Sequence, residues 1–499
     1  MPAECPRIVI IGAGAAGVFT AYRLREMYGD RYEVVLVESS GRVGGNTFST
    51  KLKYGKHDYS IDCGAQFFHP GPQASYVALL GDLGLFDDPV QVERKATGIT
   101  VWDAKADKHR LWIPAHARGF LRYGPKDWDA FTGFATFLAY AFLLDRDHPT
   151  AWGLRVDEWI AGLQLLDNEF KEKVLRPFLY QFVTLPAGRL DEGSALYAIT
   201  YFVRSVFGEA NVDEPEPDLR DPRGVETFEV YQSLIGLDGV MKRALEAAGV
   251  KPRLREPVTA VTRKGTKLQV CTTKEHIVAD HVVFATDPNV AAKLLAEGKF
   301  PAAKLIASLR KLEYADLPIS MQKGGSCWMP GNERYWEAVN TIVDGDKLRF
   351  TAWFGPLRKA YRVGKQIPVF KSWGTPSVAP DTCKHNFLVE RHRIVMPTTD
   401  FMKHRGEVAS CQGQHNVWFV GGWTDWFDSQ EAALDSATEV AERIPGKPRP
   451  GTGRATMVRI DRDAQRRRID RWLHRIANRA PLARRKKLRA LMDEVESRG

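Results

Sequence analysis

The sequence lacks a long hydrophobic run, and this absence excludes a helical membrane protein. Its longest apolar stretch, FATFLAYAFLL at residues 134–144, is about half of the roughly 20 residues that a membrane-spanning helix needs. The stretch predicts a buried helix instead. The first residues, MPAECPR, contain no apolar segment of a signal peptide. We therefore expect a cytoplasmic protein.

Cysteine is scarce as well: the 499 residues contain six, and none of them forms a C-x-x-C pair. Zinc sites and disulfide frameworks depend on closely spaced or regularly paired cysteines, so the sequence predicts neither a metal site nor a disulfide framework. Scattered cysteines fit a reducing compartment. The absence of any N-x-S/T sequon agrees with a protein that is not secreted.

The body of the chain lacks a charge excess, although the whole chain carries a net charge of +10. Residues 454–499 alone contain 15 basic and 6 acidic residues, a net charge of +9. We therefore expect no nucleic-acid partner for the body. The tail predicts two basic amphipathic helices, one with Ile469 and Trp472 on its apolar face and one with Leu488 and Met492. Such helices lie on an anionic membrane, pack on the body or pair with a second copy, and the sequence leaves these alternatives open.

What the chain does contain is an alternation of strand and helix patterns. RIVIIGAG at 7–14 is a short strand that enters a glycine turn, a helical pattern follows, and YEVVLVE at 32–38 is a second buried strand. Parallel strands joined by a helix belong to α/β sheets. Helical patterns dominate at 125–210, strand patterns follow, and NVWFVGG at 416–422 leads into a last helix.

We therefore predict an α/β protein, α+β overall, with a Rossmann-type domain assembled from separated segments. The predicted pieces of this domain are residues 1–80, 225–300 and 405–446. An inserted substrate domain of helices and a mixed sheet comprises residues 81–224 and 301–404, and residues 447–499 form the helical tail.

The first strand–helix turn carries Gly12, Gly14 and Gly17 in a G-x-G-x-x-G pattern. The first glycine permits the tight turn, the second lets the backbone approach a diphosphate, and the third lets the helix pack on the strand. The helix N-terminus presents free N–H groups to phosphate. Glu38 ends the second strand, where a carboxylate accepts hydrogen bonds from ribose hydroxyls. The stretch therefore predicts a dinucleotide site and leaves NAD and FAD both open.

The continuation, ESSGRVGGN at residues 38–46, favours FAD. The adjacent Gly44 and Gly45 let backbone N–H groups reach a second part of the ligand, and Arg42 neutralises diphosphate charge. A domain that binds only a nicotinamide cofactor has no need of this extension. IDCGAQFFHP at residues 61–70 adds a further glycine turn, placed where a chain crosses a flavin ring.

Together, the strings G-x-G-x-x-G, E-x-x-x-R-x-G-G and D-x-G-A-x-x-x-H resemble the flavin-containing amine oxidase superfamily. That group includes monoamine and polyamine oxidases, L-amino-acid oxidases, protoporphyrinogen oxidase and phytoene-desaturase relatives. The segment 416–441 is similar to the closing FAD motif of the family. The chain looks closest to a poorly characterised branch, some of whose members accompany fatty-acid-modifying genes. It departs at Gly422, where many of these oxidases have a glutamate that contacts ribitol.

The resemblance implies a cofactor site made from four parts of the chain. The early glycine turns hold the diphosphate and the ribitol, and Glu38 holds the adenosine ribose. The backbone of Val258 meets the adenine edge, and the late motif meets the ribitol and the O2 side of the flavin. Neither Cys63 nor Cys411 stands in the family's linkage context, so we expect non-covalent FAD. The implied cofactor-binding residues are Gly12, Gly14, Ala15, Ala16, Gly17, Glu38, Ser39, Arg42, Gly44, Gly45, Asn46, Gly64, Ala65, Gln66, Val258, Gly421, Gly422, Gln430, Glu431 and Ala432.

Hydride transfer to flavin N5 needs no protein nucleophile, so candidate catalytic residues are few. The resemblance implies Lys323, as a lysine that holds a water at N5 or acts as a base, and His69, beside the flavin-crossing turn. Trp423 is a candidate aromatic wall of the substrate site, and Gln430 begins the helix at the O2 side. Each has a simpler interpretation as an exposed turn lysine, a loop histidine or core packing.

We therefore expect an FAD-dependent oxidoreductase that takes a hydride from a C–N or C–H bond of a small organic substrate. Apolar and lipid-like molecules are included among the expected substrates. Two alternatives stay open. One is an FAD-dependent isomerase or desaturase acting on double bonds of fatty acids or isoprenoids. The other is a non-enzymatic FAD-bound scaffold.

Overall fold

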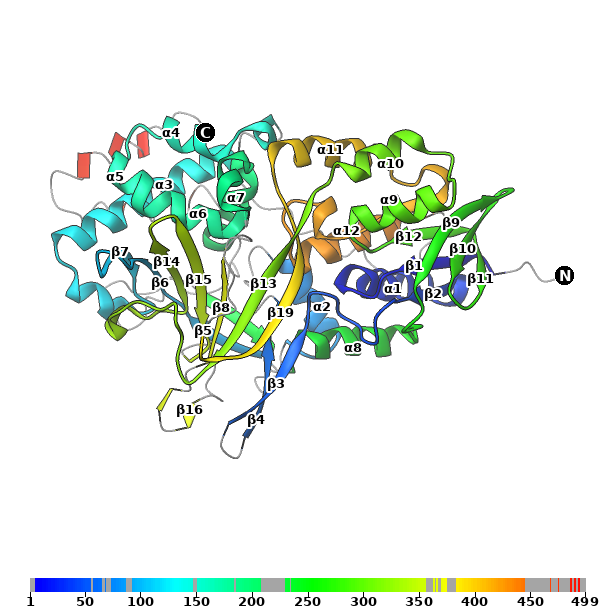
Figure 1. Cartoon of the computed structure of the whole chain (residues 1–499), viewed down its shortest axis with the longest axis horizontal. Helices are drawn as coiled ribbons and strands as arrows, with labels where there is room; N and C mark the ends of the chain where they lie inside the picture. Colours follow the sequence, from blue (N-terminus) through cyan, green and yellow to red (C-terminus); the bar gives the residue numbers. More distant parts are fainter. Residues whose placement is uncertain are drawn as a thin grey trace.

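A computed structural model describes most of the chain (Figure 1). Three of the predicted site residues, Ala65, Gln66 and His69, lie outside the described residues. The described ranges are 5–54, 57–64, 68, 73–86, 92–146, 150–183, 185–207, 229–233, 235–355, 362–363, 365–366, 369–374 and 383–444, and in the tail the single helical residues 467, 474, 485, 486, 489, 490, 492 and 493.

A four-stranded parallel sheet lies at the centre of the right half of the molecule in Figure 1. Its order is β2-β1-β12-β20, and every neighbouring pair is parallel. The strands come from three distant parts of the chain and are almost wholly apolar, because both faces of the sheet are covered. They are β1 (Arg7–Ile11), β2 (Glu33–Val37), β12 (His281–Phe284) and β20 (Val417–Phe419).

The two faces of this sheet bury alternate residues of the same strands. Ile8 and Ile10 of β1 pack against helices, whereas Val9 and Ile11 face a second, antiparallel sheet and two further helices. The helices on the first face are α1 (Ala15–Tyr28), α8 (Leu237–Ala248) and α12 (Gln430–Arg443). The other face is covered by β9 (Val258–Lys264), β10 (Lys267–Thr272), β11 (His276–Ala279), α9 (Pro288–Glu297) and α10 (Ala303–Arg310).

A seven-stranded mixed sheet forms the other half of the molecule. Its order is β19-β13-β18-β15-β14-β6-β7, and only β14 and β6 pair in parallel. The two long strands β13 and β19 run side by side along the middle of the molecule (Figure 1). The strands are β6 (Ile99–Asp103), β7 (Lys108–Ile113), β13 (Tyr314–Lys323), β14 (Val339–Asp344), β15 (Lys347–Trp353), β18 (Val369–Gly374) and β19 (Asn386–Val395).

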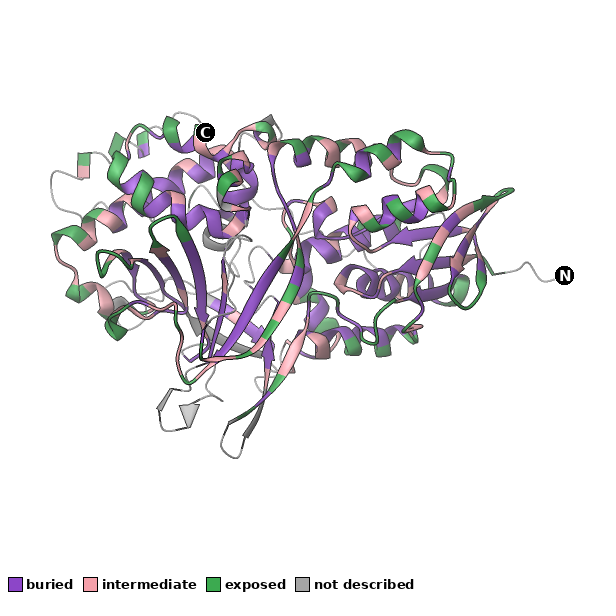
Figure 2. Ribbon diagram, viewed as in Figure 1, coloured by how far each residue is buried: buried purple, intermediate pink, exposed green. Residues whose placement is uncertain are grey.

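Helices cover one face of this sheet and bury its largest apolar core (Figure 2). The predicted buried helix at 134–144 is confirmed: it lies within α3 (Pro125–Arg146), where Phe134 and Phe137 are buried. The other helices of this core are α4 (Val156–Gly162), α5 (Asn168–Phe170), α6 (Arg176–Val183) and α7 (Ala195–Phe207). Two further helices pack in the other half of the molecule: α2 (Ala74–Asp82) lies against α12, and α11 (Thr399–Ala409) lies against α10. Short helical turns are η1 (Gly29–Arg31), η2 (Ala117–Arg122), η3 (Thr150–Gly153), η4 (Lys171–Leu175), η5 (Ala187–Glu192), η6 (Glu333–Tyr335), η8 (Gln414–Asn416) and η9 (Gly422–Thr424).

A hairpin connects the two halves. Its strands are β3 (Ser49–Tyr54) and β4 (His57–Asp62), and Leu52, Ile61 and the adjoining Cys63 pack against Ile319 and Met321 of β13. The remaining strand pairs are β5 (Val92–Ala96) with β8 (Glu229–Ser233) and β16 (Arg362–Val363) with β17 (Lys365–Gln366). The strands of the parallel sheet fall within the three predicted pieces of the first domain, and those of the seven-stranded sheet within the predicted insert. The domain boundaries themselves stay a prediction.

One expectation about the cysteines is wrong: Cys327 and Cys383 form a disulfide, with Cα atoms 5.7 Å apart. Cys327 follows the end of β13, and Cys383 precedes the start of β19. These two strands are antiparallel neighbours, with Gln322 opposite Asn386, so the residues just beyond their paired ends meet. A separation of 56 residues in the sequence carries no sign of this pairing.

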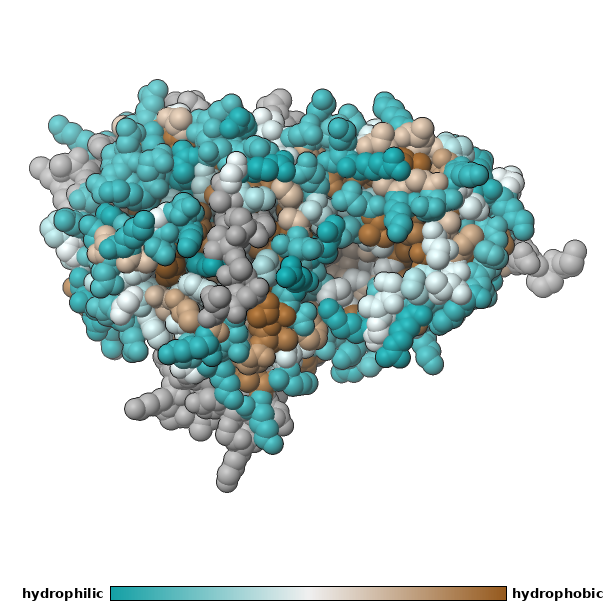
Figure 3. Space-filling view, in the orientation of Figure 1, coloured by the Kyte–Doolittle hydropathy of each residue, from teal (hydrophilic) through white to brown (hydrophobic). Residues whose placement is uncertain are grey.

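The tail makes at least one contact with the body. Met492 is buried and packs in the core beneath the helices of the seven-stranded sheet. Lys486 and Arg489, in the same tail, are exposed. Over the whole molecule, hydrophilic residues make up most of the face that Figure 3 shows. No helix among the described residues is long and apolar enough to cross a bilayer.

Candidate functional site

Four strand ends meet at one edge of the parallel sheet. Because β1, β2, β12 and β20 run in the same direction, the residues that follow them lie side by side at its carboxyl edge. These residues are Gly12, Glu38, Ala285 and, just beyond Val420, Gly421. Ligands of open α/β sheets bind at this edge. The fold therefore gathers predicted cofactor residues that are far apart in the sequence.

The three glycines of the first turn have different roles. Gly12 has a φ of 102°, and a Cβ there would collide with the carbonyl oxygen of Ala285. A Cβ on Gly17 would collide with the carbonyl oxygen of Gly12. A Cβ on Gly14 would meet nothing nearer than the Cα of Gly45, 3.9 Å away. Gly12 and Gly17 therefore shape the turn, whereas Gly14 leaves room for a ligand.

The N-terminus of α1 faces this turn. Gly14 is its N-cap and supplies no side-chain cap, and the first turn, which is described throughout, contains no acidic residue. The first N–H groups of the helix, at Ala15, Ala16 and Gly17, have no partner within the helix. Together with the helix dipole, they favour a bound anion such as a diphosphate.

A second glycine turn stacks on the first. The Gly44 N–H donates to the carbonyl oxygen of Ala13 (2.8 Å), and Gly44 and Gly45 both have positive φ. The exposed Arg42 donates to the carbonyl oxygen of Gly45 (2.9 Å), and its guanidinium lies 4.5 Å from the centre of the Phe48 ring. Two separate loops thus border the open space beside Gly14.

Glu38 ties the end of β2 to the glycine turn. Its Oε2 accepts a hydrogen bond from the Ala13 N–H (2.8 Å), and its Oε1 accepts one from the Ser40 N–H (2.7 Å) and one from the Ser39 hydroxyl (3.3 Å). A carboxylate has about four acceptor positions, so capacity is left for a ligand hydroxyl.

The predicted adenine contact lies beside Glu38. The Glu38 N–H donates to the carbonyl oxygen of Arg253, and the Glu256 N–H donates to that of Glu38 (both 2.9 Å). Val258, two residues further on, begins β9. The structure therefore places the segment before Val258 next to Glu38, and the adenine contact itself stays a prediction.

The late motif closes the same edge of the sheet. Gly421 has a φ of 143°, and its N–H donates to the Ser436 hydroxyl of α12 (3.0 Å). Ser429 is the N-cap of α12, and its hydroxyl accepts a hydrogen bond from the Ala432 N–H (3.2 Å). Gln430, the first residue of this helix, is buried.

Glu431, one of the residues implied at the start of the late helix, has a side chain that contacts α2. Its two carboxylate oxygens accept hydrogen bonds from the N–H groups of Ser75 (2.8 Å) and Tyr76 (2.7 Å) at the start of α2. Burial, together with the neighbouring Asp435, raises the pKa of Glu431 to about 8. The side chain anchors α2, so only the backbone of Glu431 is left for a cofactor contact.

Lys371 of β18 is a buried cation that the sequence reasoning missed. Its Nζ donates to the carbonyl oxygen of Gly64, in the turn that follows β4. Burial lowers the pKa of Lys371 to about 8, and burial near Lys371 and Arg42 lowers that of His392 to about 3. Nothing in the string VFKSWG marks this lysine, because an inward-facing lysine in a strand has no sequence signature.

The two remaining catalytic candidates lie apart. The Lys323 Nζ donates to the carbonyl oxygen of Lys53 in the hairpin (3.1 Å), at the end of β13. Trp423 is buried in the core on the far face of the parallel sheet, where its ring contacts Phe419 edge-on at 6.3 Å. The structure does not bring these two side chains together, and their catalytic roles stay predictions.

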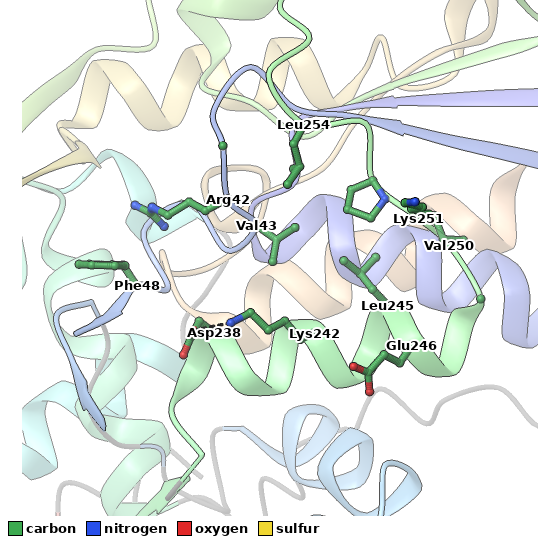
Figure 4. A pocket seen from close by; sticks show the side chains of 13 residues that line it. Arg42, Val43, Phe48, Asp238, Lys242, Leu245, Glu246, Val250, Lys251 and Leu254 are labelled. Carbon is green, nitrogen blue, oxygen red and sulfur yellow. Dashed lines mark hydrogen bonds and ion pairs between the residues drawn. The ribbon is translucent and has the colours of Figure 1, made fainter. Parts of the chain in front are cut away.

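A cleft of about 640 Å³ lies behind the second glycine turn (Figure 4). Val43, Leu245 and Leu254 lie along it, and an ion pair between Asp238 and Lys242 of α8 lies at its side (3.0 Å). Its lining is mostly apolar, and it includes Arg42 but none of the residues of the first glycine turn.

Comparison with protein families assigns the class. The family described as "Flavin containing amine oxidoreductase" matches residues 15–317, more than half of the chain. The chain belongs to this family, whose members are oxidoreductases that use FAD.

Individual relatives are distant. Polyamine oxidase 1 of Oryza sativa subsp. japonica is 34% identical over 84 residues, which cover 17% of this chain and only 16% of that protein. The CLA-producing fatty acid isomerase from P. acnes is 15% identical, with a TM-score of 0.59 over 89% of this chain and 100% of that one. Cyclohexylamine oxidase from Brevibacterium oxydans IH-35A is 16% identical, with a TM-score of 0.58 over 88% of this chain and 99% of that one. The two structural likenesses show a shared fold.

Proposed function

We propose that the chain binds FAD non-covalently at the carboxyl edge of the parallel sheet and oxidises a small organic substrate at a C–N or C–H bond. The observation that carries this proposal is the open space beside Gly14, which is bordered by two glycine turns and the N-terminus of α1. The flavin, when bound, accepts a hydride at N5.

Different residues of the site bind different parts of the cofactor. The turn at Gly12–Gly17 and the α1 N-terminus hold the diphosphate, and Arg42 adds a positive charge beside it. Glu38 accepts hydrogen bonds from the adenosine ribose, next to the backbone of Val258. The α12 N-terminus, with Gln430, stabilises negative charge on the O2 side of the flavin.

The environment of Cys63 supports a non-covalent complex. This thiol is buried directly before Gly64, and burial raises its pKa to about 12. The thiolate is the reactive form of cysteine, and here it does not form near neutral pH.

An alternative reaction is the isomerisation or desaturation of a double bond in a fatty acid or isoprenoid. The observation behind it is the likeness to the P. acnes isomerase, which extends over the full length of that chain. The oxidases share the same fold, so the family's oxidative chemistry is the first choice.

The test begins with the purified protein. We expect it to be yellow, with absorbance at about 450 nm, and we expect denaturation to release the flavin into solution. A folded, colourless preparation that binds no added FAD would contradict the proposal. Anaerobic bleaching by amines, amino acids or unsaturated fatty acids then identifies an oxidised substrate. A conversion of fatty acid without bleaching would favour the isomerase.

A further inference from the structure

Asp428 stands over Gly422 in the late motif. The chain from Gly421 to Ser429 folds back on itself, and a Cβ at Gly422 would collide with the Oδ1 of Asp428. The carboxylate therefore occupies space that any side chain at position 422 would need. Asp428 also directly precedes Ser429, the N-cap of α12, so it lies where the helix begins.

The position of Asp428 is held from a distant element. Its N–H donates to the Tyr197 hydroxyl of α7 (3.3 Å). The ring of the preceding Phe427 packs against Tyr197 and Tyr201, with centroid distances of 4.9 and 5.1 Å. Tyr197 is buried, so this contact restricts the backbone at Asp428 and thereby the direction of its side chain.

The carboxylate itself has an unusual combination of properties. Asp428 is solvent-accessible, yet enough protein surrounds it that burial, helped by Asp287, raises its pKa to about 6. Within the described part of the chain, no N–H, hydroxyl or cation is bonded to this carboxylate. The nearby arginines are engaged elsewhere: Arg393 pairs with Asp287 (3.0 Å), and Arg405 donates to the carbonyl oxygen of Asp425.

The chemistry of such a group limits its ligand. An ionised carboxylate only accepts hydrogen bonds, and it repels phosphate. The fitting partner is a neutral group with several donors, such as a polyhydroxylated chain. Asp428 follows β20, two strands from β1 in the sheet, and neighbouring strands are about 4.8 Å apart. A ligand whose diphosphate lies at the first glycine turn would therefore reach Asp428 with the part just beyond its phosphates.

We infer that the carboxylate of Asp428 binds the hydroxyl groups of the ribityl chain of FAD. The inference rests on the proposed FAD site and deepens it, because it assigns the segment between the diphosphate and the ring. Gly422 makes this role possible, because any larger residue at position 422 would collide with the Asp428 carboxylate. Asp428 positions the ribityl chain of the cofactor and takes no part in the hydride transfer.

The experiment compares the binding of FAD and ADP to apo-protein by flavin fluorescence and calorimetry. ADP contains the adenosine diphosphate half and no ribityl chain. We expect Asp428→Ala to raise the Kd for FAD by about tenfold or more, as for a lost hydrogen bond to a charged group, and to leave the Kd for ADP unchanged. Asp428→Asn keeps the shape and one acceptor, so its loss should be smaller. The asparagine variant alone still tests the inference if the alanine variant does not fold.

The failures are distinguishable. If the wild type binds neither FAD nor ADP, the proposed function fails and the inference with it. If the wild type binds FAD and both variants bind it equally well, the inference alone is overturned. Equal losses of FAD and ADP would assign Asp428 a general structural role and overturn the inference as well.

Discussion

Lys371 and Gly64 join the two halves of the molecule: the Lys371 Nζ on the seven-stranded sheet donates to the carbonyl oxygen of Gly64, in the turn that follows β4. Gly64 in turn lies against the second glycine turn, because a Cβ there would collide with the carbonyl oxygen of Asn46. Through Gly64, the seven-stranded sheet thereby supports the loop that borders the proposed cofactor site.

This contact leads to a first prediction. Replacement of the buried Lys371 by methionine removes a charge-assisted hydrogen bond, worth about 1.5–3 kcal/mol, from the support of the turn. We expect Lys371→Met to weaken FAD binding by about tenfold, measured by fluorescence titration. Lys347→Met is the matched control, because Lys347 is an exposed lysine at the start of β15 in the same sheet. Equal affinities in both variants would contradict a role of Lys371 in supporting the turn.

The glycine turn allows a sharper test. Gly14 has φ −68° and ψ −179°, which alanine adopts without strain, and its Cβ would point into the open space. We expect Gly14→Ala to keep the Tm of the apo-protein and to lose FAD binding by at least about tenfold. Gly17→Ala should instead lower the Tm, because its Cβ collides with the backbone of Gly12. Normal FAD binding by Gly14→Ala would show that the diphosphate of FAD does not bind at this turn.

Glu337 predicts a pH dependence of stability. It is buried and accepts a hydrogen bond from the Trp112 indole N–H (2.8 Å), and burial raises its pKa to about 7. Between pH 4.5 and about 7 the folded protein binds this proton more tightly than the unfolded chain does, so stability falls as pH rises through this window. The shift corresponds to about 3 kcal/mol.

The variant Glu337→Gln isolates this contribution. Glutamine keeps the acceptor for Trp112 and has no charge, so the variant should gain stability at pH 8 and little at pH 5. Thermal unfolding of both proteins at the two pH values measures the difference, and the other titrating groups cancel in the comparison. Parallel pH profiles would show that Glu337 ionises without cost.

The tail offers a fourth prediction. Met492 is buried against the core of the helices, and its replacement by alanine should cost about 2 kcal/mol or more and lower the Tm. Lys486→Ala, at an exposed position of the same segment, should leave the Tm unchanged. Identical Tm values would show that the tail does not pack on the body. Binding to anionic vesicles before and after removal of residues 447–499 then tests the membrane alternative.

Local patterns predicted the local structure well. The run of residues 7–38 is a βαβ unit, because alternate residues of β1 must be buried on both faces of a covered sheet. The strand patterns expected after residue 210 include β9 and β10, which meet in a tight turn because Gly265 supplies the positive φ that such a turn needs. These features depend on residues that are neighbours in the chain.

Features that depend on distant contacts escaped the sequence. Lys371 and Asp428 have ordinary sequence surroundings. Only strand pairing directs Lys371 inward, and only the contact with α7 positions Asp428. The disulfide of Cys327 and Cys383 follows from the register of β13 and β19. Glu431 was predicted as a cofactor-binding residue without a role for its side chain, and the packing of α2 on α12 directs that side chain to the N–H groups of Ser75 and Tyr76.

The sequence by itself determined the dinucleotide-binding motif, because the glycine spacing and Glu38 belong to a single βαβ unit. It also determined the family, through motifs that are local strings. The tertiary structure decided which charged side chains point inward and what they contact. Burial and hydrogen bonding of such groups depend on elements hundreds of residues away, and no local pattern records them.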